Sequence, residues 1–226
     1  MLKTLLGLNI DELCALVQEK GEPAYRGKQL AEWIYQHGAR TFEEMTNLPD
    51  KLRAHLRQEY EVGRSQTVAI QHSRDGTIKL LLTLDDGSKV ETVGLPYGDR
   101  FGCCLSTQVG CPVGCVFCAT GLGGYTRNLT AGEIVDQVLA VQEAELNQQL
   151  QIDRRTRVDH VVFMGMGEPL LNYAATVKAM RLLKRGAWYC REASDSQHCR
   201  FCSRHPQVST GENASHPGSI PPCSYR

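Results

Sequence analysis

The sequence lacks an excess of charge of either sign, and it lacks any long apolar run. Lysine plus arginine number 25 and aspartate plus glutamate number 25 among 226 residues. No strong overall field therefore attracts nucleic acid, which would need a local basic face. No stretch of roughly 18 apolar residues is present, and polar residues interrupt the first dozen positions before any cleavage-like site. We therefore expect a globular, cytoplasmic protein with no membrane partner.

The C-terminal segment lacks leucine and lysine altogether. Residues 1–185 contain 25 leucines, whereas residues 186–226 contain none, and Val208 and Ile220 are their branched aliphatic residues. Such a segment cannot build a core, and its seven serines, four prolines and four cysteines predict an irregular, disordered tail. Because the change is abrupt, our hypothesis is that the chain is truncated or read in a shifted frame after about residue 185.

The first sixty residues have the pattern of short helices, and strands are expected after them. Asn9 with Glu12, and Thr41 with Glu44, form capping-box pairs, and each pair leads into apolar positions. After Gly63 the pattern changes to strands separated by Asp-Gly turn dipeptides, as expected between antiparallel partners. We predict these strands at 66–72, 77–84 and 88–95.

The middle of the chain alternates between strands and helices. Strands are predicted at 101–106 and 158–164. A helix should start at Thr130, where Glu133 completes a capping box, and a second helix should cover about 173–185. Because this order builds parallel sheets or barrels, the predicted fold class is α/β.

Three of the ten cysteines lie within eight residues, at Cys111, Cys115 and Cys118. Without a secretory signal, metal or redox chemistry explains the cysteines better than a disulfide framework. The spacing C-x-x-x-C-x-x-C, in a glycine-bearing loop after a predicted strand, allows three thiolates to bind one face of an iron–sulfur cubane. The fourth iron would then lack a protein ligand and be open to a small molecule.

Two other interpretations of these cysteines remain. Cys115 and Cys118 would form a four-cysteine zinc site with Cys199 and Cys202, although Cys111 would then be idle. Buried apolar thiols are the second alternative, but three thiols beside glycine and proline are typical of a ligand loop rather than a core strand.

A second motif, Gly165 to Asn172, follows the predicted strand at 158–164 directly. Ligands bind at the carboxyl ends of parallel strands, where glycines permit close backbone approach and a carboxylate can hold an ammonium or hydroxyl group. Glu168 is the natural candidate for that contact. Taken alone, the Gly-x-Gly pattern also fits an ordinary tight turn between strand and helix.

Together these motifs resemble known families. The cysteine spacing, with Phe117 before the last cysteine, resembles the signature of the radical S-adenosylmethionine (SAM) superfamily, and Gly167-Glu168-Pro169 resembles its SAM-binding element. Over about residues 10–185 the chain resembles the dual-specificity adenine carbon-2 methyltransferases of 23S rRNA and tRNA. The segments that carry this closer resemblance are 25–29, 42–49, 90–93, 104–111 and 164–172.

The resemblance implies a domain organisation. Residues 1–97 would form an accessory domain of helices and a small antiparallel sheet. Residues 98–185 would form the first part of a TIM-like radical SAM barrel, and residues 186–226 match nothing in the family. The relatives continue to a C-terminal cysteine that accepts a methyl group, and no cysteine here lies in a matching context, which makes the activity of this chain doubtful.

The resemblance also implies cofactors and residue roles. Cys111, Cys115 and Cys118 would hold a [4Fe–4S] cluster, and Phe117, Gly167 and Glu168 would contact SAM. In the family one SAM methylates the late cysteine, and a radical from a second SAM takes hydrogen from that methyl group, which then adds to adenine. Two further roles fall on Glu91, as proton acceptor, and on Cys104, which would release the protein–RNA adduct as a disulfide.

Without the family, Glu91 is an exposed strand carboxylate and Cys104 a thiol of the strand core. The implied partners are 23S rRNA, tRNA and an electron donor such as flavodoxin or ferredoxin, with the chain as a monomer. A non-catalytic iron–sulfur or RNA-binding remnant and the zinc module are the alternatives. Some residues of the accessory domain could touch RNA or could simply form a solvated surface. They are Tyr25, Arg26, Lys28, Trp33, Arg40, Lys51, Arg53, Arg57 and Arg64. Arg127, outside that domain, is expected to be functional in an unknown role.

Overall fold

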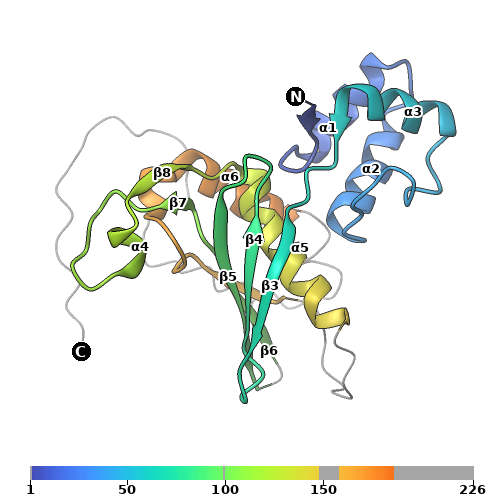
Figure 1. Ribbon diagram of the computed structural model, residues 1–226. Coiled ribbons are helices and arrows are strands. Elements are labelled where there is room, and N and C mark those ends of the chain that lie inside the picture. Colours follow the sequence, from blue (N-terminus) through green and yellow to red (C-terminus); the bar gives the residue numbers. More distant parts are fainter. Residues whose placement is uncertain (1, 99, 148–157, 186–226) are drawn as a thin grey trace. The chain divides into compact units, whose positions relative to one another are not determined.

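The computed structural model describes residues 2–98, 100–147 and 158–185 (Figure 1). The predictions for the tail, including the zinc pairing with Cys199 and Cys202, lie outside these residues. In the described part of the chain, no helix has both the length and the apolar character needed to cross a membrane.

The N-terminal residues form three helices and two very short strands. Strand β1 (Lys3–Thr4) pairs in parallel with β2 (Tyr60–Glu61), and between them lie α1 (Ile10–Glu19), α2 (Tyr25–Tyr35) and α3 (Asp50–Glu59). The capping box at the start of α1 is confirmed, because Asn9 Oδ1 accepts from Glu12 N and Glu12 Oε2 accepts from Asn9 N. The helices pack around fully buried Leu13, Leu30, Ile34, Leu52 and Leu56.

The helix predicted to start at Thr41 is absent from the described residues, and that prediction is wrong. The Thr41 hydroxyl donates to Glu44 Oε1 at 2.9 Å instead of accepting from a helical N–H, and the following residues form turns. Pro49 disfavours helical backbone at Leu48, so a helix here could not run past that residue. The helix begins after the proline instead, at Asp50.

A five-stranded sheet forms the centre of the described structure, in the order β3-β4-β5-β6-β9. Neighbouring strands from β3 to β6 are antiparallel, whereas β9 is parallel to β6, so the sheet is mixed. The predicted hairpins are confirmed, with Gly76 and Gly87 at φ +84° and +80° in their turns. The strands are β3 (Gln66–His72), β4 (Ile78–Thr83), β5 (Lys89–Tyr97), β6 (Arg100–Cys104) and β9 (His160–Val162).

One face of this sheet is covered by α5 (Ala131–Asn147), which Figure 1 shows running along the strands. Its predicted start is confirmed, because Thr130 N donates to Glu133 Oε2 and Glu133 N donates to Thr130 Oγ1. Gly94 of β5 permits close packing, since a Cβ there would lie 2.9 Å from Val141 Cγ1. Alternate residues of each strand therefore face α5, and the others face the opposite side.

The remaining elements surround the carboxyl ends of β6 and β9. A two-stranded hairpin, β7 (Gln108–Gly110) with β8 (Tyr125–Asn128), encloses the cysteine motif and the short helix α4 (Ala119–Leu122). After β9 come a 3₁₀ turn η1 (Pro169–Asn172) and the predicted helix α6 (Tyr173–Arg185).

A buried ion-pair network connects the start of β3 to α5. The Arg64 guanidinium donates to Asp136, and both side chains are 2% exposed. Ser65 donates to the same carboxylate through its backbone N–H, at 2.8 Å, and through its hydroxyl. Glu143, one more carboxylate on α5, accepts from Arg40 and from Arg64 at 2.7 and 3.0 Å. Neither Arg40 nor Arg64 is therefore free for RNA contact.

Candidate active site

The cysteine loop, residues 111–118, is closed by the β7–β8 hairpin. Cys111 N donates to Gly124 O at 2.9 Å, and Cys118 N donates to Cys115 O at 3.0 Å. Gly110, at φ +74°, has to be glycine because a Cβ there would lie 1.9 Å from Gly124 O. The hairpin thus fixes both the entry to the loop and its return.

The three thiols of the loop are free and half-buried. Backbone N–H groups of Gly121 and then Thr120 lower the pKa of the Cys118 thiol, which favours the thiolate, the form that binds metals. Phe117 is 89% exposed and therefore has its ring available to a ligand. The donor chemistry fits an iron–sulfur cluster. Among the described residues, however, no group of three His, Cys, Asp or Glu side chains is arranged to hold a metal ion.

The Gly-Glu-Pro turn, residues 165–169, lies directly against the strand that leads into the cysteine loop. A Cβ on Gly165 would lie 2.8 Å from Leu105 O. Gly167 has φ +98°, and a Cβ there would lie 2.7 Å from Gln108 N. Both glycines are therefore required by the close approach of two backbones.

Hydrogen bonds join this turn to residues 106–108. Met166 O accepts from Thr107 N at 2.7 Å and from Gln108 N at 3.2 Å. Met166 N donates to Ser106 Oγ at 2.8 Å. Ser106 is itself held by the side-chain amide of Gln137 on α5. Ser106 N donates to Gln137 Oε1 at 2.7 Å, and Gln137 Nε2 donates to Ser106 O at 2.9 Å. The turn is thus fixed relative to the cysteine loop.

Glu168 lies near the end of this turn and also caps η1. Its Oε1 accepts from Leu170 N at 3.1 Å, and its backbone N donates to the side chain of Gln108 at 2.8 Å. Asn172, at the other end of η1, is buried and donates to Thr107 O and Leu129 O at 2.7 and 2.8 Å. Glu168, whose carboxylate is predicted to contact SAM, is therefore held by hydrogen bonds at both its backbone and its side chain.

Glu91 and Cys104 lie on the sheet face opposite α5. Cys104 pairs with Val93, two residues after Glu91, so strand alternation places both on one face. Glu91 is tied to the Gly-Glu-Pro turn, because its N–H donates to Met166 Sδ at 3.4 Å and its C=O accepts from Ser106 Oγ at 2.6 Å. The structure therefore brings the two predicted reaction residues close to that turn.

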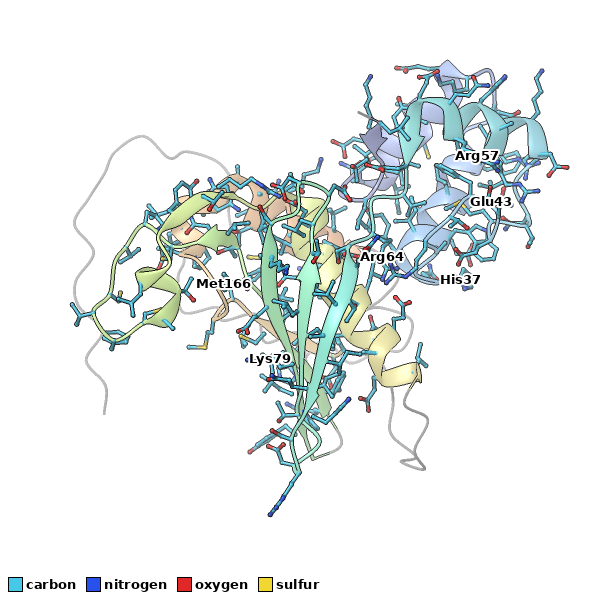
Figure 2. The ribbon with its side chains drawn as sticks, in the orientation of Figure 1. His37, Glu43, Arg57, Arg64, Lys79 and Met166 are labelled. Carbon is cyan, nitrogen blue, oxygen red and sulfur yellow. The ribbon has the colours of Figure 1, made fainter. Side chains whose placement is uncertain are left out.

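The Glu91 carboxylate forms an ion pair with Lys79 of β4, with 3.1 Å between Nζ and Oε1. Figure 2 labels Lys79, which pairs with Val93 of β5, and Met166, whose sulfur contacts Glu91 near the start of the same strand. Both partners of the ion pair are partly exposed, so a molecule bound at this face can reach them.

The adjacent cysteines of β6 differ because they face opposite sides of the sheet. Cys103 is fully buried against α5, and burial raises the pKa of its thiol to about 12. Cys104 is half-buried on the other face; burial raises the pKa of its thiol, and a hydrogen bond from the Met164 backbone partly opposes this. The Cys104 thiol is therefore mainly protonated at neutral pH.

Sequence reasoning found no role for several residues that the structure places here, namely Lys79, Ser106, Gln108 and Asn172. Ser106, Gln108 and Asn172 lie within the recognised segments 104–111 and 164–172 without a role that their local sequence indicates, and Lys79 lies in a predicted strand with no motif around it. Arg127 has a structural role. Its guanidinium binds Asp86 at 2.6 Å and Glu133 at 2.7 Å, and so connects β8 to the turn between β4 and β5 and to α5. Among the accessory residues, Arg53 pairs with Asp50 and Arg57 with Glu43.

Comparisons with known proteins show similarity in sequence and in fold. A family model described as the ribosomal RNA large subunit methyltransferase N-terminal domain matches residues 3–62. The chain is 51% identical over 181 residues to a probable dual-specificity RNA methyltransferase RlmN of Thermosynechococcus vestitus, covering 80% of this chain and 51% of that protein. The protein of the same description from Gloeobacter violaceus is 50% identical over 183 residues, covering 81% of this chain and 50% of that protein.

A solved structure is also similar. The crystal structure of a radical SAM methyltransferase from Sphaerobacter thermophilus has a TM-score of 0.72 and 43% sequence identity, covering 80% of this chain and 52% of that one. The predicted α/β fold class is thereby confirmed. The chain spans about half the length of the curated relatives it matches. Over about 80% of its own length, the chain therefore matches RlmN methyltransferases in sequence and a radical SAM methyltransferase in fold.

Proposed function

We propose that this chain contributes the cofactor site and two reaction residues of an RNA methyltransferase. The reaction would add a methyl group to carbon-2 of adenine in 23S rRNA and tRNA. The observation that supports it most is the grouping of Glu91, Cys104 and the Gly-Glu-Pro turn, which is bonded to the strand entering the cysteine loop. Because the chain spans about half of its relatives, the activity, substrates and partners of the whole protein are part of this proposal.

The cofactor set that we propose is a [4Fe–4S] cluster and SAM. Cys111, Cys115 and Cys118 would hold the cluster, and Phe117, Gly167 and Glu168 would hold SAM. When bound, the pair supplies one-electron chemistry that produces a 5′-deoxyadenosyl radical. Glycine at 167 permits close backbone approach, and the Glu168 carboxylate is a suitable acceptor for the ammonium group of SAM.

Carbon-2 of adenine is electrophilic, so polar transfer of a cationic methyl group to it is unfavourable, which favours a radical route. In this proposal Glu91 accepts the proton that leaves the base after the new carbon–carbon bond forms. Lys79 holds the Glu91 carboxylate at 3.1 Å. The adduct would also give up its unpaired electron to the one-electron carrier of the site. The Cys104 thiolate would then attack the sulfur that bears the methylene bridge, so that an S–S bond forms and the C–S bond breaks. The electron pair of the broken bond goes to the methylene carbon, which takes up a proton and becomes the methyl group of the released RNA.

The partners follow from this chemistry. We propose 23S rRNA and tRNA as substrates, flavodoxin or ferredoxin as the electron donor, and a monomer acting in the cytoplasm. Most accessory arginines are occupied by carboxylates, so Tyr25, with the Arg26 guanidinium 4.8 Å from its ring centroid, is the better candidate for contact with RNA bases.

The test is anaerobic reconstitution of the chain with iron and sulfide, followed by incubation with SAM, reductant and an rRNA fragment. Mass spectrometry of the digested RNA would detect 2-methyladenosine, and Cys111→Ala should abolish both the brown colour and the product. Cys14→Ala is the matched control, because this half-buried free cysteine lies in α1 and donates to Ala24 O.

The outcomes separate the alternatives. Methylated adenine that depends on Cys111 supports the proposal. A brown protein whose spectrum responds to SAM but that yields no methylated adenine indicates a cluster-binding remnant. A colourless protein that retains zinc in place of iron indicates the zinc module and contradicts the proposal.

A further inference from the structure

We infer that Gln108 is a positioning residue that sets Glu168 in place for SAM, relative to the cysteine loop. This inference rests on the proposed function, since it concerns how the same cofactor site is held. Gln108 lies on β7, three residues before Cys111, and its side chain is one of the few buried polar groups near the site, at 1% exposure.

The side chain of Gln108 uses both ends of its amide. Its Oε1 accepts from Glu168 N at 2.8 Å, and its Nε2 donates to Asn128 Oδ1 at 2.8 Å. A backbone N–H is always a donor, so the amide oxygen has to face Glu168 and the amide nitrogen has to face Asn128. The orientation of this glutamine is thus determined by its neighbours.

The two partners of Gln108 belong to different parts of the site. Asn128 lies opposite Gln108 in the β7–β8 hairpin that encloses the cysteine loop, and its Oδ1 also accepts from Tyr125 OH at 3.1 Å. Glu168 belongs to the Gly-Glu-Pro turn on the far side of β7. One buried amide therefore joins both strands of the hairpin to the backbone of the residue proposed to bind SAM.

The backbone position of Glu168 determines where its carboxylate lies. Buried polar groups need a partner, so replacing Gln108 by leucine would leave the Glu168 N–H without an acceptor and would favour movement of the turn. Gly167 makes the arrangement tight, because a Cβ at this residue would lie 2.6 Å from Gln108 Cβ. Gln108 acts through Glu168 and holds no cofactor atom itself.

Groups that orient metal-binding residues typically change affinity or activity by about 10- to 100-fold when removed, and the lower end is expected for Glu168. We therefore expect Gln108→Leu to weaken SAM binding about tenfold while the iron content stays the same. Gln108→Glu should recover little of the affinity, because its carboxylate accepts from Glu168 N but places a second acceptor against Asn128 Oδ1 in a buried position. The matched control is Gln142→Leu, since the Gln142 Oε1 is buried on α5 without a partner in the described part of the chain.

The measurement uses the full chain with its cluster reconstituted anaerobically. The electron paramagnetic resonance spectrum of the reduced cluster, titrated with SAM, gives an apparent Kd for each variant. Amide hydrogen exchange over residues 165–172 of the cluster-free chain gives a second readout that needs no cofactor. We expect faster exchange for Gln108→Leu and unchanged exchange for Gln142→Leu.

Equal SAM affinity and equal exchange in wild type and Gln108→Leu would overturn the role of Gln108 alone. A cluster-loaded wild type whose spectrum does not respond to SAM would instead overturn the proposed cofactor site, and with it this inference. In that case faster exchange in Gln108→Leu still shows that the amide holds the turn, so the two failures are distinguishable.

Discussion

Replacing Asp136 by alanine should destabilise the protein strongly, because Asp136 is the carboxylate of a buried ion pair. The mutation leaves the Arg64 guanidinium, 2% exposed, without its main counter-charge, and it removes the acceptor for Ser65 N–H and its hydroxyl. Removal of one partner of a buried ion pair costs about 3–5 kcal/mol. Arg64 keeps bonds to Gly38 O and Glu143, so we expect the lower end, about 3 kcal/mol.

The matched control is Arg57→Ala. Arg57 pairs with Glu43 on the surface, where both side chains are 59% exposed, and Figure 2 labels this pair as well as Arg64. Solvent-exposed pairs contribute roughly 0–1 kcal/mol. Urea unfolding of the cluster-free chain, followed by circular dichroism, gives the free energy of unfolding of each variant.

Salt provides a second criterion for the same prediction. Concentrated salt screens the exposed pair but not the buried one, so the loss in Asp136→Ala should persist at about 1 M salt. If Asp136→Ala and Arg57→Ala destabilise the chain to within about 1 kcal/mol of each other, burial does not determine the strength of these pairs and the reasoning fails.

Three further predictions concern a close contact, a thiol and an acidic turn. Gly132→Ala should cost about 1–3 kcal/mol in thermal unfolding despite the higher helix propensity of alanine, because its Cβ would lie 2.3 Å from Leu6 O. The rate of Cys104 alkylation, followed by peptide mass spectrometry at a series of pH values, should rise with a midpoint above the ordinary thiol pKa of about 8.5, because burial raises the pKa of this thiol. Fast labelling at pH 7 would contradict the raised pKa. The Arg127 guanidinium lowers the pKa of Asp86, so their pair stabilises the fold above about pH 4 and is lost on acidification. The difference in stability between wild type and Asp86→Asn should therefore be largest near pH 7 and shrink below pH 4.

The sheet and its turns could be predicted from sequence because their signals are local. The Asp-Gly dipeptides at 75–76 and 86–87 require glycine at positive φ, which fixes the hairpins and hence the order of β3, β4 and β5. The capping box at Thr130 similarly marks the start of α5. In each case one or two residues determine the backbone over a short stretch.

Interactions between distant residues could not be predicted in the same way. The Thr41 N–H donates to Glu44 as in a capping box, but the Thr41 hydroxyl donates as well instead of accepting, and turns follow in place of a helix. The parallel pairing of β1 with β2 joins residues more than fifty positions apart, and two-residue strands have no periodic pattern. The role of Gln108 depends on Glu168, sixty residues later, so nothing in its local sequence indicates it.

The opposite orientations of Cys103 and Cys104 make the length of one turn chemically important. In a strand, a shift of register by one residue moves every side chain to the other face. A single-residue insertion between Tyr97 and Arg100 that shifts β6 by one position would therefore bring the inert sulfur of Cys103 to the site face and bury that of Cys104 against α5. An engineer who grafts this sheet, or compares relatives of different turn length, should count residues in that turn before assigning the reactive sulfur.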